Sequence, residues 1–185
     1  MKFEHLPLPG LVKIIPTRVG DHRGYFSEVF KLEDFRRNVA DVAFVQENES
    51  LSSAVGTVRG LHFQLEPFAQ GKVVRCLAGS IFDVAVDIRV GSPTYGQWYG
   101  TELSKQNGEQ LWVPAGFAHG FATLQPDSVI LYKVTAPYSA ENDRGLLWND
   151  PEIGIKWPLP LDNAVLSDKD RKQPALTDLP PSFTY

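Results

Sequence analysis

Residues 80–90, SIFDVAVDIRV, carry the pattern that decides the fold. Apolar side chains recur at every second position, which is typical of a β-strand whose two faces have different surroundings. One face carries Phe82, Val84, Val86 and Ile88, and the other carries Asp83, Ala85, Asp87 and Arg89. We expect Asp87 and Arg89 to face solvent. The place of Asp83 is left open, because a barrel that encloses a ligand can line a polar cavity with this second face.

Similar short runs lie on both sides of this stretch, separated by Gly, Pro, Asn and Asp, and this spacing predicts an all-β sandwich or barrel. The other candidate strands are residues 11–19, 25–30, 43–50, 57–64, 72–79, 97–104, 109–116, 118–125 and 128–136. Helical periodicity is scarce. The best case is residues 32–40, where Leu32, Phe35 and Val39 share one face.

After Tyr138 the composition shifts toward Pro, Asp and Trp with little regular pattern. This segment is too apolar for a free tail, because it contains Trp148, Ile153, Ile155 and Trp157. We expect it to wrap back over the barrel. Within it, Ser167 followed by Asp170 predicts a capping box that opens a short helix, which Pro174 limits.

Length and composition predict one globular domain spanning residues 1–185, since 43% of the residues are hydrophobic and 22% are charged. The net charge of −4 provides no basic field for nucleic acid or an anionic membrane. Cys76 is the only cysteine, which excludes an internal disulfide and predicts a packed, inert thiol in a reducing compartment. We find no secretory leader pattern and no membrane-spanning run, and therefore expect a cytoplasmic protein.

Two histidines stand in glycine-spaced strand contexts. The spacing around the second fits the cupin pattern G-x5-P-x-G-x2-H through Gly108, Pro114, Gly116 and His119. The first, His62, follows Gly56 at the spacing that opens the other cupin motif. A metal-binding cupin has a second histidine two residues later, where this chain has Gln64, and a neutral amide is a poor ligand for a transition metal. The pattern thus supports a β-barrel and argues against a metal, with a three-ligand site of His62, Glu66 and His119 as the minor alternative.

The stretch 59–72, RGLHFQLEPFAQGK, gathers a guanidinium, an imidazole and an amine beside an apolar strand pattern. This combination suggests a site where an anionic substrate loses a proton. His62 is the candidate general base, although a lone histidine is more often hydrogen-bonded within a core. Lys72 is suited to stabilise an enolate oxygen as it forms, and its alternative is a lysine at a strand end with its amine in solvent.

Tyr132 shares strand parity with Ile130 and Val134, so its ring is expected to point inward. A core aromatic with a satisfied hydroxyl is the commoner case. The functional alternative is a general acid, because a phenol with a pKa near 10 can donate a proton to a carbanion.

A second group of residues has the chemistry of nucleotide recognition. Arg23 and Arg59 offer paired donors to phosphate, and the amides of Gln46 and Asn48 suit a nucleobase or a sugar. Each residue alone would be an ordinary surface or turn residue.

Together these pieces resemble one family, and the resemblance runs from about Leu11 to about Pro174. The matching stretches are DHRGYFSE, VQENES, VRGLHFQ, AQGKVVRC, GSIFDVAVDIRVGSPTYGQW, VPAGFAHGF, Tyr132 with Lys133, WNDPEIGIKWP and LSDKD. In this density and order they resemble the dTDP-4-dehydrorhamnose 3,5-epimerases. The resemblance implies a cupin-like jelly-roll β-barrel with a few short helices, a homodimer, and no metal or organic cofactor. It implies a dTDP-4-keto-6-deoxy sugar as substrate, on the route to dTDP-L-rhamnose for polysaccharide synthesis.

The resemblance also implies roles for individual residues. His62 falls on the catalytic base, Tyr132 on the proton donor and Lys72 on the enolate stabiliser. Asp170 falls on the aspartate that pairs with the base, and Asp168 is the alternative for that place. The substrate-binding positions are Arg23, Glu28, Gln46, Asn48, Arg59, Lys72, His119, Tyr138, Asp143 and Lys169. The family often has glutamate where this chain has Asp143, so the carboxylate reaches less far by one methylene.

Three rival functions stay open at this point. A relative that inverts only one carbon would carry the same motifs. A metal-dependent cupin oxygenase is disfavoured by Gln64. A non-catalytic barrel that binds sugar nucleotides is disfavoured by the presence of His62, Lys72 and Tyr132 together.

Overall fold

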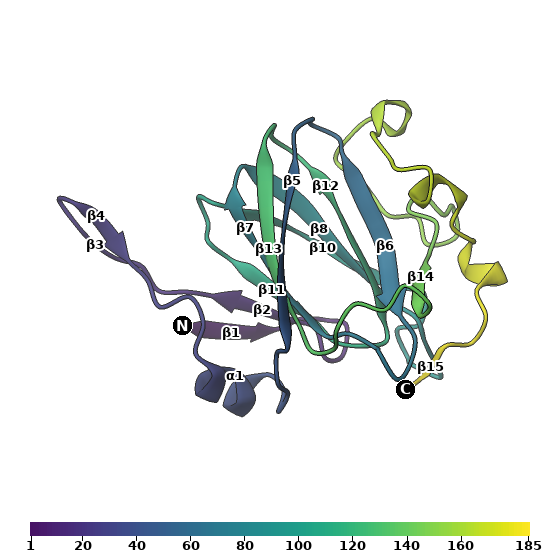
Figure 1. The fold of residues 1–185 in the computed structure, drawn as a ribbon, viewed down its shortest axis with the longest axis horizontal. Coiled ribbons are helices and arrows are strands. Elements are labelled where there is room, and N and C mark those ends of the chain that lie inside the picture. Colours follow the sequence, from purple (N-terminus) through teal and green to yellow (C-terminus); the bar gives the residue numbers. More distant parts are fainter.

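Two β-sheets face each other in the computed structural model, which describes all residues 1–185 (Figure 1). The six-stranded sheet has the order β1 (Lys2–His5), β2 (Val12–Ile15), β11 (Gln110–Val113), β7 (Lys72–Ala78), β13 (Ser128–Val134) and β5 (Gln46–Ser52). The five-stranded sheet has the order β10 (Trp98–Ser104), β8 (Ser80–Asp87), β12 (Phe117–Thr123), β6 (Val58–Gln64) and β14 (Asp143–Gly145). The predicted all-β, cupin-like jelly roll is confirmed, although the two sheets do not close into one hydrogen-bonded barrel.

Two small pairings complete the sheet structure. An antiparallel hairpin of β3 (Val19–Asp21) and β4 (Gly24–Phe26) projects from the barrel as an arm (Figure 1). Near the C-terminus, β15 (Phe183–Thr184) pairs in parallel with β9 (Arg89–Val90). Every candidate strand overlaps an observed strand, and β3 overlaps its candidate only at Val19. The three strands that the pattern missed, β1, β14 and β15, have at most four residues and too few alternations to be recognised.

Residues Asp87 and Arg89 do not face solvent, and this expectation is wrong. The Asp87 side chain is fully buried and accepts hydrogen bonds from Arg89 Nη2 at 2.7 Å, Ser92 Oγ at 2.6 Å and Thr94 Oγ1 at 2.7 Å. Burial alone would raise the pKa of Asp87, but these hydrogen bonds hold the pKa below its usual value. The Arg89 guanidinium lies between the rings of Phe117 and Tyr185, so the C-terminal residues cover this end of the strand.

The remaining polar position of that face, Asp83, is also fully buried and lies between the two sheets. Its neighbours on this inner face are apolar and include Val74, Ala85, Leu111 and Ile130. Cys76 belongs to the same cluster, and burial raises the pKa of its thiol to about 11, as expected for a packed, inert cysteine.

The C-terminal segment covers the outer face of the five-stranded sheet, as predicted (Figure 1). Trp148 and Trp157 pack there with Val84, Val86 and Ile88, and the Trp157 Nε1–H donates to the Trp148 carbonyl at 2.8 Å. The segment contains three short 3-10 helices, η1 (Leu161–Asn163), η2 (Asp170–Lys172) and η3 (Leu176–Asp178). The segment therefore forms a third layer on top of the two sheets.

One α-helix, α1 (Leu32–Asn38), lies against the outer face of the six-stranded sheet. Phe35 is buried there, with its ring centroid 5.1 Å from Trp112 and 5.2 Å from Phe44. Leu32 was expected on the same face but is 39% exposed, because it is the first helical residue. No helix in the structure has the length and apolar character needed to span a membrane.

Replacing Trp157 with alanine tests the third layer. We expect the free energy of unfolding to fall by about 3–5 kcal/mol, because a large buried ring is removed from a packed cluster. Leu161→Ala is the control in the same segment, since Leu161 is 50% exposed, and it should change stability by less than about 0.5 kcal/mol. Both are measured by chemical denaturation at equal protein concentration. Equal effects of the two variants would show that the segment does not pack as described.

Candidate active site

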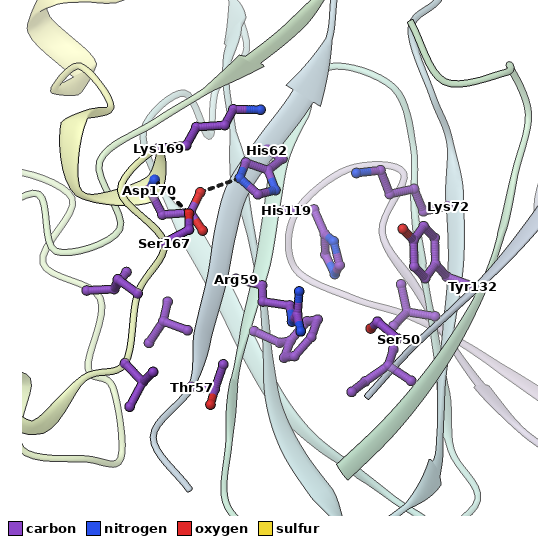
Figure 2. Close-up of a pocket in the computed structure, with 16 residues that line it drawn as sticks. Ser50, Thr57, Arg59, His62, Lys72, His119, Tyr132, Ser167, Lys169 and Asp170 are labelled. Atoms are coloured by element: carbon purple, nitrogen blue, oxygen red, sulfur yellow. Dashed lines mark hydrogen bonds and ion pairs between the residues drawn. The ribbon is translucent and has the colours of Figure 1, made fainter. Parts of the chain in front are cut away.

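A cavity of about 480 Å³ opens between the two sheets, in the size range of small-molecule sites (Figure 2). Four of its lining residues are the predicted catalytic side chains. They come from β6, β7, β13 and η2 and are His62, Lys72, Tyr132 and Asp170. The alternation of β6 places His62 on the inner face, because its neighbours Leu61 and Phe63 belong to the apolar cluster on the outer face.

His62 is paired with Asp170, across 108 residues of sequence, by a contact of 2.5 Å between Nε2 and Oδ1. The Asp170 side chain is 5% exposed. Burial alone would raise its pKa, but the hydrogen bond and charge of His62 and the hydrogen bond with Ser167 hold the pKa below the usual value. An ionised Asp170 can only accept, so the His62 Nε2–H donates and Nδ1 of the neutral ring is left to accept a proton. Asp168 is exposed, so Asp170 is the aspartate that the fold places against His62.

The predicted capping box is half formed. The Ser167 Oγ accepts a hydrogen bond from the Asp170 N–H at 3.1 Å, as a capping residue does. The Asp170 carboxylate faces His62 and does not return to the Ser167 backbone. The short turn η2 therefore serves to aim this carboxylate into the cavity (Figure 2).

Lys72 and Tyr132 lie on the opposite wall from His62, on neighbouring strands of the six-stranded sheet (Figure 2). Burial lowers the pKa of Lys72 to about 8, against the opposing effect of the negative charges of Asp143 and Asp83. Burial raises the pKa of the Tyr132 hydroxyl, with the positive charge of Arg59 working in the other direction. At neutral pH the wall thus presents an ammonium group and a protonated phenol.

His119 lies directly beside His62 in the ladder between β12 and β6. Its Nε2 contacts Asp83 Oδ1 at 3.0 Å and Oδ2 at 3.1 Å, so the site contains a second histidine–aspartate pair. The sequence pattern assigns no function to Asp83. The signal was present as a carboxylate in an apolar strand, but alternation alone cannot distinguish a polar cavity from solvent.

Arg59 lines the same cavity and is held by the six-stranded sheet. Its Nε donates to Ser52 Oγ at 3.0 Å and its Nη2 to the Leu51 carbonyl at 2.9 Å. The Nη1 group makes no hydrogen bond within the protein, so it is available to an anion in the cavity.

A second cavity of about 320 Å³ shares His62, Lys72, Tyr132 and Lys169 with the first and forms its mouth. Its other lining residues include the predicted substrate-binding residues Gln46, Asn48, Tyr138 and Asp143. The Gln46 Nε2 donates to Asn48 Oδ1 at 2.7 Å. Asp143 Oδ2 accepts from the Tyr138 hydroxyl at 3.1 Å and forms an ion pair with Lys169 Nζ.

The side-chain amide of Gln64 forms hydrogen bonds with backbone groups. Its Nε2 donates to the carbonyls of Phe68 at 2.7 Å and Pro137 at 3.1 Å, and its Oε1 accepts from the Ser139 N–H at 2.8 Å. No group of three or more His, Cys, Asp or Glu side chains is arranged to hold a metal ion. The alternative set of His62, Glu66 and His119 is therefore not assembled.

Two predicted substrate-binding residues, Arg23 and Glu28, line neither of these cavities. Arg23 lies in the projecting hairpin of β3 and β4, where its Nη2 contacts Asp21 Oδ2 at 2.5 Å (Figure 1). Its side chain is 78% exposed. Within one chain, the fold does not bring this arm to the site.

Comparison with known proteins gives consistent results. The sequence model of the family described as dTDP-4-dehydrorhamnose 3,5-epimerase matches residues 5–178. The dTDP-4-dehydrorhamnose 3,5-epimerase of Sinorhizobium fredii is 66% identical over 185 residues, covering 100% of this chain and 94% of the relative.

Solved structures extend the likeness to the fold. A crystal structure of dTDP-6-deoxy-D-glucose-3,5-epimerase RmlC from Legionella pneumophila, in complex with dTDP-4-keto-L-rhamnose, matches with a TM-score of 0.94 and 40% identity. That match covers 100% of this chain and 98% of the other. ChmJ, a 3′-monoepimerase from Streptomyces bikiniensis in complex with dTDP-quinovose, matches with a TM-score of 0.87 and 32% identity, over 93% of this chain and 86% of the other. By the extent and identity of these matches, the chain belongs to the dTDP-4-dehydrorhamnose 3,5-epimerase family.

Proposed function

We propose that the protein is an epimerase that inverts C3 and C5 of dTDP-4-dehydro-6-deoxy-D-glucose to give dTDP-4-dehydro-L-rhamnose. The observation that carries this proposal is the placement of a paired base, His62 with Asp170, across a cavity from Lys72 and Tyr132. We infer the identity of the substrate from the related proteins. The side chains of this one domain carry out the proton transfers without a cofactor.

The first step is removal of a proton next to the C4 ketone. The carbonyl acidifies the hydrogens on both C3 and C5, because the carbanion at either carbon is delocalised onto the C4 oxygen. His62 accepts the proton at Nδ1, and the Asp170 carboxylate stabilises the imidazolium through the Nε2–H bond. The pair needs no rearrangement during the transfer.

The second step is stabilisation of the enolate. The Lys72 ammonium lies across the cavity from His62, where it can meet the negative charge that develops on the C4 oxygen. A buried ammonium acts strongly there because little water screens it.

The third step is delivery of a proton to the opposite face of the same carbon. Tyr132 holds its hydroxyl proton at neutral pH and lies on the wall opposite His62 (Figure 2). Removal from one face and delivery from the other inverts the centre. His62 then releases its proton to solvent and Tyr132 regains one, and repetition at the second carbon gives the doubly inverted product.

The remaining predicted residues would hold the nucleotide and the sugar. Arg59, with its Nη1 free, and Lys169 suit the diphosphate. The amide and hydroxyl groups near the mouth suit the sugar and the nucleobase. We assign substrate binding to Gln46, Asn48, His119, Tyr138 and Asp143.

A single inversion is the second candidate function. It is favoured by one observation, the 32% identity and TM-score of 0.87 to a 3′-monoepimerase. That likeness implies that one scaffold serves single and double inversion, so the four catalytic side chains do not by themselves decide between the two.

We also propose that the enzyme works as a cytoplasmic homodimer in which the arm of one subunit serves the site of the other. The arm exposes Val19, Tyr25 and Phe26 by 67%, 54% and 74%, more apolar surface than an isolated hairpin usually presents. If Arg23 and Glu28 contact substrate, they must do so in a partner. The free thiol of Cys76 and a nucleotide substrate both suit the cytoplasm.

Deuterium incorporation tests the reaction. Incubation of the protein with the 4-keto sugar nucleotide in D2O should place deuterium at both C3 and C5, followed by NMR. His62→Ala should slow incorporation at both carbons by about 10²–10⁴-fold, whereas Tyr132→Phe should impair inversion more than exchange. Deuterium at one carbon alone would select the single-inversion candidate. Substrate binding with no incorporation would overturn both candidates.

The pH dependence tests the role of Lys72. The pKa of Lys72 is lowered to about 8, so the ammonium is lost as the pH rises through this value and kcat should fall there. Arginine keeps its charge at a much higher pH, so Lys72→Arg should have a lower rate but no fall near pH 8. A wild-type rate that stays level well above pH 8 would remove Lys72 as the charged enolate stabiliser.

Mixed dimers test the arm. Arg23→Ala and His62→Ala subunits should each be nearly inactive alone. In a dimer of one of each, the arm of the His62→Ala subunit completes the site that retains His62, so random mixing should restore about a quarter of wild-type activity. No recovery in confirmed mixed dimers would show that Arg23 does not serve the partner's site.

A further inference from the structure

Three side chains meet across the mouth of the cavity, and we call Tyr138, Asp143 and Lys169 the clasp. Asp143 Oδ2 accepts from the Tyr138 hydroxyl at 3.1 Å and contacts Lys169 Nζ. The Asp143 side chain is 13% exposed, whereas that of Lys169 is 50% exposed. The carboxylate is thus the inner member on which two surface side chains converge.

The carboxylate has a fixed position relative to His62. Asp143 begins β14, which pairs with β6 in the register Asp143 with Gln64 and Gly145 with His62. Backbone bonds continue the pairing on either side, from Leu65 N to the Asn142 carbonyl at 3.0 Å and from Leu146 N to the Leu61 carbonyl at 2.9 Å. The rigid ladder that carries the base therefore also carries Asp143.

The segment that carries Asp170 is attached differently. Its backbone joins the barrel before it, where Val165 N donates to the Gly56 carbonyl, and after it, where Leu147 N donates to the Pro174 carbonyl. Between these points, residues 166–173 make backbone hydrogen bonds only among themselves. The ion pairs that hold this stretch to the barrel are Lys169 with Asp143 and Asp170 with His62.

We infer that Asp143 is a positioning residue for the reaction, because it holds Lys169 and thereby fixes the neighbouring Asp170 against His62. This inference rests on the proposed function for its catalytic meaning, but the positioning itself is a property of the free protein. Asp143 and Lys169 thus have a positioning role in addition to any contact with the substrate.

We expect loss of the clasp to change the segment that carries Asp170 without unfolding the protein. A partly exposed ion pair contributes little to stability, so its loss leaves the fold intact. Catalysis is more sensitive, because a displacement of about 1 Å at a catalytic group can cost about 100-fold in rate. Loss of the clasp should therefore be visible as greater mobility of the segment that carries Asp170 and as a lower kcat.

The test compares Asp143→Asn, Lys169→Met and the double variant with wild type. Amide hydrogen exchange of residues 167–172 should accelerate about tenfold in each variant, since the tether is broken. The kcat for deuterium incorporation should fall about tenfold, separately from any rise in KM that lost substrate contact causes. The double variant should be no worse than either single variant, because both remove the same contact.

Two controls separate this effect from others. Glu109→Gln removes the partner of Lys13, whose Nζ lies 3.5 Å from Glu109 Oε2 in a pair remote from the segment, and should match wild type. Asp143→Glu keeps the charge and should retain most of kcat. Lys169→Met leaves the charge of Asp143 near Lys72, so it reports the tether without changing the negative charge that acts on Lys72.

The outcomes are distinct. Unchanged amide exchange in residues 167–172 would overturn the inference whatever the kinetics. A raised KM with normal kcat, or additive losses in the double variant, would also overturn it and leave direct substrate contact as the role. If wild type shows no incorporation, the proposed function fails, and amide exchange still decides whether the tether exists.

Discussion

The pairing of His62 with Asp170 is the interaction on which the rest of the structure depends. The two residues are separated by 108 positions, so the contact exists only if the C-terminal segment returns across the five-stranded sheet. The packing of Trp148 and Trp157 on the outer face of that sheet provides this return. The third layer thus carries Asp170 to the wall of the cavity, and it continues beyond Asp170 through η3 to β15.

Two carboxylates in the cavity are paired with histidines, whereas the ammonium of Lys72 has no partner. Asp83 contacts His119 and Asp170 contacts His62, so each buried carboxylate has a partner, as the cost of desolvation demands. Lys72 makes no side-chain hydrogen bond or ion pair, and burial lowers its pKa while the charges of Asp143 and Asp83 act in the opposite direction. An ammonium without a direct partner can meet negative charge that appears during a reaction. This is the arrangement that the proposed stabilisation of an enolate requires.

Period-two patterns predict most of the strands and the inward parity of Tyr132, since alternation is a local property of the chain. They give the wrong environment for Asp87, because the pattern is the same whether solvent or the nearby groups of Arg89, Ser92 and Thr94 satisfy a polar residue. The sequence does not decide between Asp168 and Asp170 as the partner of His62 for a related reason, because two residues of one turn differ only in the direction in which the backbone points their side chains. Motif resemblance supplied such long-range partners, but not the contact between Asp143 and Lys169, which depends on two loops meeting.

The late position of Asp170 also has a consequence for biosynthesis. Chains are made from the N-terminus, and folding can begin before synthesis ends. Every strand of both large sheets precedes Asp170, so the walls of the cavity can assemble on the ribosome while the base still lacks its carboxylate. A nascent chain can thus enclose a sugar nucleotide before it can turn one over.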